Sequence, residues 1–109
     1  MRRYEFTCTV TGKGGHGAMP DTAVDPVVAA AALIRSAAGC LSGGARVEWR
    51  SIQGGTRFNI IPEQVTVTGL LLAPDHGTDA CRIQLEEGVR HVMSAFRTQG
   101  KLRFAGEVQ

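Results

Sequence analysis

The sequence predicts an α+β domain of the ferredoxin-like type, with the element order β-α-β-β-α-β. Two observations lead to this prediction. Apolar and polar residues alternate in four separate segments, as in half-buried strands, and two longer segments have the composition or the spacing of helices. Because a hairpin lies between the two helices, we expect one four-stranded antiparallel sheet with both helices on one face.

The first half of the chain predicts a strand, a helix and a second strand. The first strand covers Arg3 to Thr11, whose apolar face consists of Tyr4, Phe6, Cys8 and Val10. Asp25 is expected to cap a helix, because its side chain can accept from free amides and Pro26 suits the first helical position. This helix is predicted over Val27 to Ala38, and alternation returns over Arg46 to Ser51.

The second half predicts a strand, a helix and a last strand. The third strand is expected over Glu63 to Leu72, with one face formed by Val65, Val67, Gly69 and Leu71. Thr78 or Asp79 is expected to cap the second helix. Steps of three and four place five apolar residues on one face of that helix: Cys81, Leu85, Val89, Val92 and Phe96. The helix is predicted to end at Gln99-Gly100, before a strand over Lys101 to Val108.

Composition limits the class of protein. The chain has 109 residues, the length of a single domain over residues 1–109, and its 12 basic and 10 acidic residues give a net charge of +2. A nearly neutral domain is not typical of nucleic-acid binding. No apolar run approaches the ~20 residues that cross a bilayer. The first residues lack a secretory signal, so we expect a cytoplasmic protein that binds neither nucleic acid nor membranes.

The three cysteines support the same compartment. Cys8, Cys40 and Cys81 are widely spaced, odd in number and without a CxxC pair, which argues against disulfides or a zinc knuckle. We expect reduced thiols that behave as small buried apolar residues. The chain begins and ends almost within predicted strands, which favours a domain cut from a longer protein.

Two segments contain the candidate functional residues. GKGGHGAMP follows the first strand and holds His16 in a glycine-rich loop, where its ring can donate a hydrogen bond to developing negative charge. GGTRFNIIP precedes the third strand and contains Asn59, the only asparagine, whose amide can donate to an oxyanion or a carboxylate. From chemistry alone, an ordinary loop histidine and a turn asparagine remain open alternatives.

These segments give a family resemblance. GKGGHGAMPDTAVDPVVAAA, followed by SIQGGTRFNIIPEQVTVTG and a helix, resembles the lid or dimerisation domain of zinc-dependent amidohydrolases and exopeptidases. That family includes aminoacylases, hippurate hydrolases, auxin-conjugate hydrolases and glutamate carboxypeptidases. The resemblance covers Tyr4 to Phe104, and the family's lid has the fold predicted above.

The resemblance implies a division of labour between two domains. A larger catalytic domain holds two zinc ions, and the lid inserted into it pairs with a second lid, through a sheet edge and helices, to form a homodimer. It further implies that His16 reaches the partner subunit's active site and stabilises the oxyanion of amide hydrolysis. Asn59 matches the family's asparagine that binds the substrate's carboxylate or carbonyl oxygen.

The sequence departs from the family in three respects. Asp21 follows Pro20, where similar members often have a histidine, and we assign it no role. The sequence contains no zinc-binding segment, and its other histidines, His76 and His91, are expected to be solvated surface residues. Leu72 stands where the family carries an arginine that binds the substrate's carboxylate, and a leucine cannot make that contact. Either Arg57 or Arg50 replaces this arginine, or the substrate lacks the carboxylate.

Two other functions are compatible with the predicted fold. A free-standing ferredoxin-like domain could bind a small molecule or a protein, and a native chain ending near Gln109 would favour it. An RNA-recognition domain needs exposed aromatic residues on two central strands and a basic surface. The nearly neutral charge, and aromatic residues that mostly lie on apolar faces, disfavour that function.

Overall fold

The computed structural model describes residues 1–16, 24–55 and 57–108, with only the backbone described for Gly15 and His16. Its strands are β1 (Arg2–Thr11), β2 (Gly15–His16), β3 (Arg46–Gly54), β4 (Ile60–Ile61), β5 (Gln64–Ala73) and β6 (Gln99–Val108). Its helices are α1 (Pro26–Ser36), the short 3-10 helix η2 (Ala37–Cys40) and α2 (Thr78–Ala95). The long strands and the α-helices occur in the predicted order.

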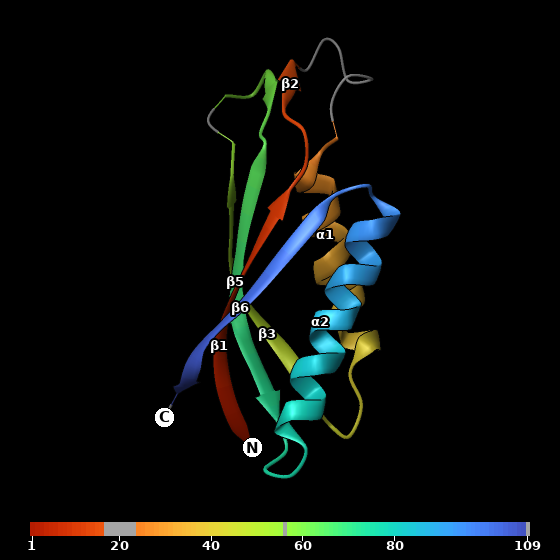
Figure 1. Ribbon diagram of the computed structural model, residues 1–109. Helices are drawn as coiled ribbons and strands as arrows, with labels where there is room; N and C mark the ends of the chain where they lie inside the picture. The colour runs from red at the N-terminus through yellow and green to blue at the C-terminus, as the bar shows by residue number, and fades with distance from the viewer. Residues whose placement is uncertain (17–23, 56, 109) are drawn as a thin grey trace.

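The four long strands form one antiparallel sheet in the order β3-β5-β1-β6. Both α-helices lie on the same side of this sheet, as Figure 1 shows. α1 packs against β5 and β1, whereas α2 packs against β6 and β5. The predicted α+β, ferredoxin-like class is therefore confirmed.

The core lies between the sheet and the helices. The predicted inward faces of β1 and β5 are buried, apart from the half-buried Tyr4, because alternate residues of a strand point to the same face. Cys8 and Cys81 are buried free thiols, and Cys40 is half-buried. The largest fully buried side chains include Val10, Leu33, Val65, Val67, Leu71, Leu85 and Met93.

An aromatic cluster fills the middle of this core. Phe6 on β1 makes edge-to-face contacts with Trp49, at a centroid distance of 5.6 Å, and with Phe104, at 6.2 Å. Opposite Phe6 in the register lies Gly69 on β5. A Cβ on Gly69 would lie 2.9 Å from the Phe6 ring and 2.6 Å from the backbone oxygen of Glu48. The absence of a side chain at this position therefore makes room for the ring.

The beginning of α1 follows the sequence prediction, but its end does not. The N–H of Val27 donates to Oδ1 of Asp25 at 2.8 Å, so Asp25 is the N-cap. The helix ends at Ser36 rather than Ala38, and the chain continues as η2. Tightening of the last turn into 3-10 geometry is common at helix ends.

The predicted ends of α2 were wrong. Gly77, with a φ of 86°, is its N-cap, and neither Thr78 nor Asp79 caps it. Its buried stripe includes Met93, whereas Phe96 lies beyond the last helical residue and is exposed. Arg97 adopts a left-handed φ of 55°, and the N–H of Thr98 donates to the Met93 carbonyl at 3.0 Å. This C-cap turns the chain into β6 two residues earlier than predicted.

Helix α2 also approaches η2 closely. A Cβ on Gly88 would lie 2.5 Å from Sγ of Cys40, so only glycine allows this separation. Ser42 and Gln84 exchange two hydrogen bonds beside this contact, at 3.2 and 2.8 Å. Within the ranges described, no helix has the length and apolar composition needed to cross a membrane.

Candidate functional site

A short ladder of strands projects beyond one end of the sheet. β2 pairs antiparallel with β4, with Gly15 opposite Ile61 and His16 opposite Ile60. We call this ladder and the turn Arg57–Ile60 the tip. The sequence predicted only an irregular glycine-rich loop here. Two-residue strands show no periodicity, so local pattern could not have revealed them.

The tip brings the two predicted site residues together. Asn59 lies in the turn in which the N–H of Ile60 donates to the carbonyl of Arg57 at 3.4 Å. Ile60 pairs with His16, so Asn59 directly precedes the residue opposite His16. Asn59 is exposed. The remainder of the GGHGAMP motif, residues 17–20, lies outside the described residues.

Main-chain contacts hold the tip onto the sheet. The N–H of Gly12 donates to the carbonyl of Glu63 at 2.9 Å, and the two N–H to carbonyl bonds between Lys13 and Val24 measure 2.8 and 2.9 Å. A Cβ on Gly12 would overlap the carbonyl oxygen of Val24, and one on Gly14 would lie 2.9 Å from that of Ile61. The glycines at these positions therefore permit a close backbone approach.

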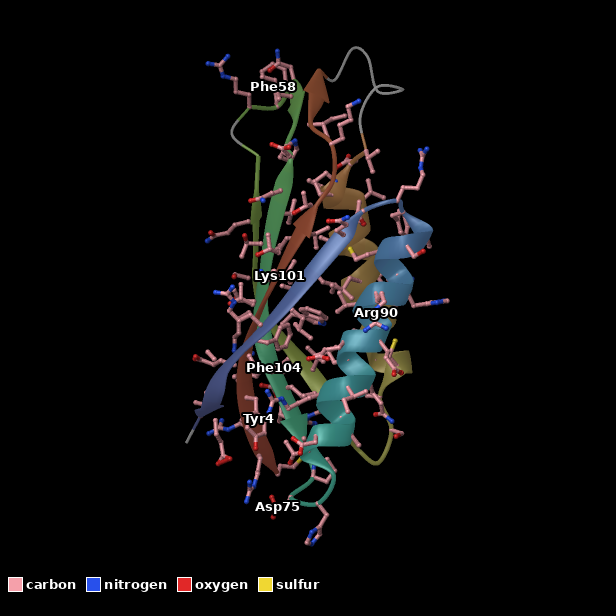
Figure 2. The ribbon with its side chains drawn as sticks, viewed as in Figure 1. Tyr4, Phe58, Asp75, Arg90, Lys101 and Phe104 are labelled. Carbon is pink, nitrogen blue, oxygen red and sulfur yellow. The ribbon has the colours of Figure 1, made fainter. Side chains whose placement is uncertain are left out.

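An exposed aromatic residue occupies the outermost part of the tip. Phe58, between Arg57 and Asn59, is fully exposed at 104% of its reference area, and Ile60 is 38% exposed. Figure 2 places Phe58 at one end of the molecule and Asp75, just after β5, at the other. Sequence reasoning missed this residue, because whether a turn residue is exposed depends on where the turn projects.

Leu72 lies far from the tip. It sits near the last residue of β5, is 6% exposed, and is flanked in the register by Arg3 and Arg46. Of the two arginines predicted to replace the missing one, Arg50 donates to Glu48 at 2.7 Å. Arg57 lies in the tip. The two candidates therefore occupy different parts of the domain.

Metal-binding residues are not gathered in the part of the chain that is described. No group of three or more histidine, cysteine, aspartate or glutamate residues there could hold a metal ion. His76 and His91 are exposed, as predicted. The described residues therefore do not fit a zinc site.

The outer faces of the two α-helices differ in character. On α1, Val27 and Val28 are 39% and 51% exposed, and Arg35 is the helix's one charged residue. On α2, the exposed residues include the charged Glu86, Glu87 and Arg90 together with the apolar Ile83. β3, which leads from α1 and η2, is an edge strand and carries Ile52, which is 46% exposed. Exposed apolar side chains on both α1 and the edge strand β3 are compatible with a protein interface.

The sequence matches one protein family over most of its length. Residues 4–94 match the M20 family domain described as the peptidase dimerisation domain. The chain is similar to IAA-amino acid hydrolase ILR1-like 2 of Arabidopsis thaliana, with 35% identity over 82% of this chain and 20% of that protein. N-acetyldiaminopimelate deacetylase of Bacillus velezensis is 32% identical over 92% of this chain and 29% of its own length.

Solved structures share the fold. An aminobenzoyl-glutamate utilization protein from Klebsiella pneumoniae superposes with a TM-score of 0.86 over 100% of this chain and 29% of that one, at 17% identity. A putative aminohydrolase from methicillin-resistant Staphylococcus aureus has a TM-score of 0.75 and 26% identity, and it aligns over 94% of this chain and 29% of its own. This chain thus spans less than a third of the length of each of these four proteins.

Proposed function

This chain belongs to the peptidase dimerisation domain family of the M20 peptidases, and we propose that it is the lid and dimerisation domain of a zinc-dependent amidohydrolase. The proposed substrates are N-acyl amino acids or related amides. Relatives named as an IAA-amino acid hydrolase, an N-acetyldiaminopimelate deacetylase and a hippurate hydrolase support this class. The two zinc ions would be held by a separate catalytic domain.

The observation that carries the proposal is the pairing of His16 with Ile60, next to Asn59. In the proposed reaction, water attacks the scissile amide and negative charge develops on the carbonyl oxygen. The imidazole of His16 donates a hydrogen bond to that oxygen, and the amide of Asn59 donates to a substrate oxygen. One tip thus supplies two hydrogen-bond donors to the reacting group.

We further propose that two copies pair along β3, with the α1 helices beside the joint. The exposed apolar residues Val27, Val28 and Ile52 support an interface on the side formed by α1 and β3. The exposed arginines of β3, Arg46 and Arg50, pair with Glu48 on the same strand. The other edge strand, β6, carries exposed Lys101 and Arg103, and positive charges on an edge strand discourage pairing. Pairing two edge strands about a two-fold axis gives a continuous eight-stranded sheet.

This arrangement accounts for delivery of His16 to the partner subunit. β3 runs towards the tip, because Gly54 pairs with Val65 whereas Arg46 pairs with Leu72. In an antiparallel pair of β3 strands, the tip of each chain projects towards the opposite end of its partner. His16 of one subunit then lies near the end of the partner's sheet that is opposite to the partner's own tip.

A complementation experiment tests the proposal. Two inactive forms of the full-length protein are mixed: one carries His16→Ala, and the other has an inactivated catalytic domain. If His16 acts across the dimer, mixed dimers regain activity, because one of their two sites then has both an intact catalytic domain and an intact histidine. Mixtures that stay inactive, although mass measurement finds mixed dimers, would contradict action in trans.

A matched pair of substitutions tests the interface. Val28→Asp on α1 and Ile83→Asp on α2 alter residues that are 51% and 53% exposed. We expect Val28→Asp to raise the dimer dissociation constant about tenfold or more, because it buries a charge in the interface. Ile83→Asp should leave it unchanged in sedimentation equilibrium. Equal effects of the two substitutions would rule out the α1 side.

A further inference from the structure

Arg57 lies in the same turn as Asn59, and we propose that it binds the carboxylate of the substrate. The inference rests on the function proposed above and deepens it. It assigns to Arg57 the selection of N-acyl amino acids over amides that lack a carboxylate. Arg57 is thus a substrate-binding and specificity-determining residue.

The substrate chemistry requires a cation near the scissile bond. In an N-acyl amino acid, a single carbon atom separates the amide nitrogen from the ionised carboxylate. Near an active site shielded from water, this negative charge costs free energy unless a positive group pairs with it. A guanidinium is the best match, because its planar donors can bind both carboxylate oxygens at once.

Three arginines of the body already have partners: Arg46 and Arg50 on β3, and Arg82 on α2. Glu48 lies 2.7 Å from Arg50 and 3.8 Å from Arg46, so both share one carboxylate. Arg82 lies 3.9 Å from Asp79 and stacks over the Phe104 ring, at 4.7 Å from its centroid. Binding a substrate at any of these would require breaking an existing interaction.

Arg57 differs from them in both place and environment. It is exposed, and within the described ranges no carboxylate lies at ion-pair distance from it. The hydrogen bond from the N–H of Ile60 to its carbonyl closes a turn that also contains Asn59. The first and fourth Cα atoms of such a turn lie within about 7 Å of each other, and Arg57 and Asn59 are its first and third residues. One small ligand can therefore contact both side chains.

Lys13 is the other cation close to the tip. It is exposed, and its backbone pairs with Val24 rather than with β4. Its ammonium is a point charge on a flexible stem and lacks the planar fork that matches a carboxylate. Lys13→Ala therefore serves as a control for a general loss of positive charge.

The experiment uses a panel of N-acyl amino acids and, for the best substrate, the matching carboxamide. The two compounds differ only in the charged group, and release of the acyl acid is measured for both. The full-length protein is compared with Arg57→Ala, Arg57→Lys, Lys13→Ala and Arg50→Ala. Melting temperatures of all variants are recorded, and an exposed residue is expected to leave them unchanged.

We expect Arg57→Ala to lower kcat/KM for the acid by about 10- to 100-fold, the range for a lost hydrogen bond to a charged group. The carboxamide should be cleaved by this variant at about the wild-type rate, and Arg57→Lys should be intermediate on the acid. A loss of equal size on both compounds, or a larger selective loss in Lys13→Ala or Arg50→Ala, would overturn the inference. If the wild-type protein cleaves no member of the panel, the proposed function itself is wrong.

Discussion

Phe6 in the body of this domain is buried, whereas Phe58 in its tip is exposed. In the body, formed by the four-stranded sheet with α1 and α2, Phe6 is 2% exposed and packs against two aromatic rings. In the tip, Phe58 is fully exposed and lies beside Asn59. Side chains in the body therefore stabilise the fold, whereas side chains in the tip are free to contact another molecule. Substitutions in the two regions should change different measured quantities.

The largest effect is expected in the tip. His16→Ala in the full-length protein should lower kcat about 10²- to 10³-fold, the cost of removing one donor to an oxyanion. Steady-state kinetics with an N-acyl amino acid measures this, and zinc content and melting temperature serve as controls. Wild-type turnover in this variant would show that His16 does not stabilise the oxyanion.

The next largest effect is a loss of stability at high pH, caused by the buried Cys8 in the body. Burial raises the pKa of the Cys8 thiol from its ordinary value near 9.0 to about 11. Between these values the unfolded chain loses this proton while the folded chain keeps it, so stability falls as pH rises from 9 to 11. The expected loss is about 2–3 kcal/mol.

Urea unfolding of the 109-residue chain and of Cys8→Ala at several pH values measures this effect. The difference between the two curves isolates Cys8 from other groups that titrate in the same range. If the two proteins lose stability in parallel from pH 8 to 11, the thiol is not responsible.

A smaller effect is expected at the glycine that faces Phe6. Gly69→Ala should lower the free energy of unfolding by about 1–3 kcal/mol, because its Cβ would crowd the Phe6 ring and the Glu48 carbonyl. Gly39→Ala is the matched control, since its Cβ would meet no atom within 4 Å. Chemical denaturation compares the two. Equal stabilities would mean that the sheet relaxes around the added methyl group.

The smallest effect on folding is expected at the tip. Phe58→Ala should change the free energy of unfolding by less than about 0.5 kcal/mol, because the ring makes no buried contact. Phe6→Ala, the matched change in the body, should cost about 3–5 kcal/mol. A large loss for Phe58→Ala would erase the distinction between the two regions.

The sequence predicted the body well because the body depends on periodic patterns. The alternation in β1 and β5 correctly identified their buried faces, and Asp25-Pro26 correctly marked the beginning of α1. The ends of α2 were wrong, because they depend on two backbone conformations, the positive φ of Gly77 and of Arg97. Thr78 and Asp79 have side chains that commonly cap helices, but the N-cap position of α2 is occupied by Gly77.

The tip was less predictable because it joins segments distant in the chain. His16 and Asn59 were proposed from a family resemblance and from their donor chemistry, and nothing local in either segment indicated that they adjoin. Their proximity follows from the pairing of β2 with β4, which depends on three-dimensional packing rather than on periodicity. The environments of Arg50 and Arg57 could likewise be distinguished only by their positions in the fold.

The tip is held in place by main-chain hydrogen bonds rather than by side-chain contacts. The N–H of Gly12 donates to the carbonyl of Glu63, and the N–H of Ile60 donates to the carbonyl of Arg57. Residues 57–59 can therefore be exchanged during evolution with little penalty to folding, because their side chains do not hold the turn in place. Substrate range can diverge rapidly at these three positions while the scaffold is conserved, which makes the tip the natural place to redesign specificity.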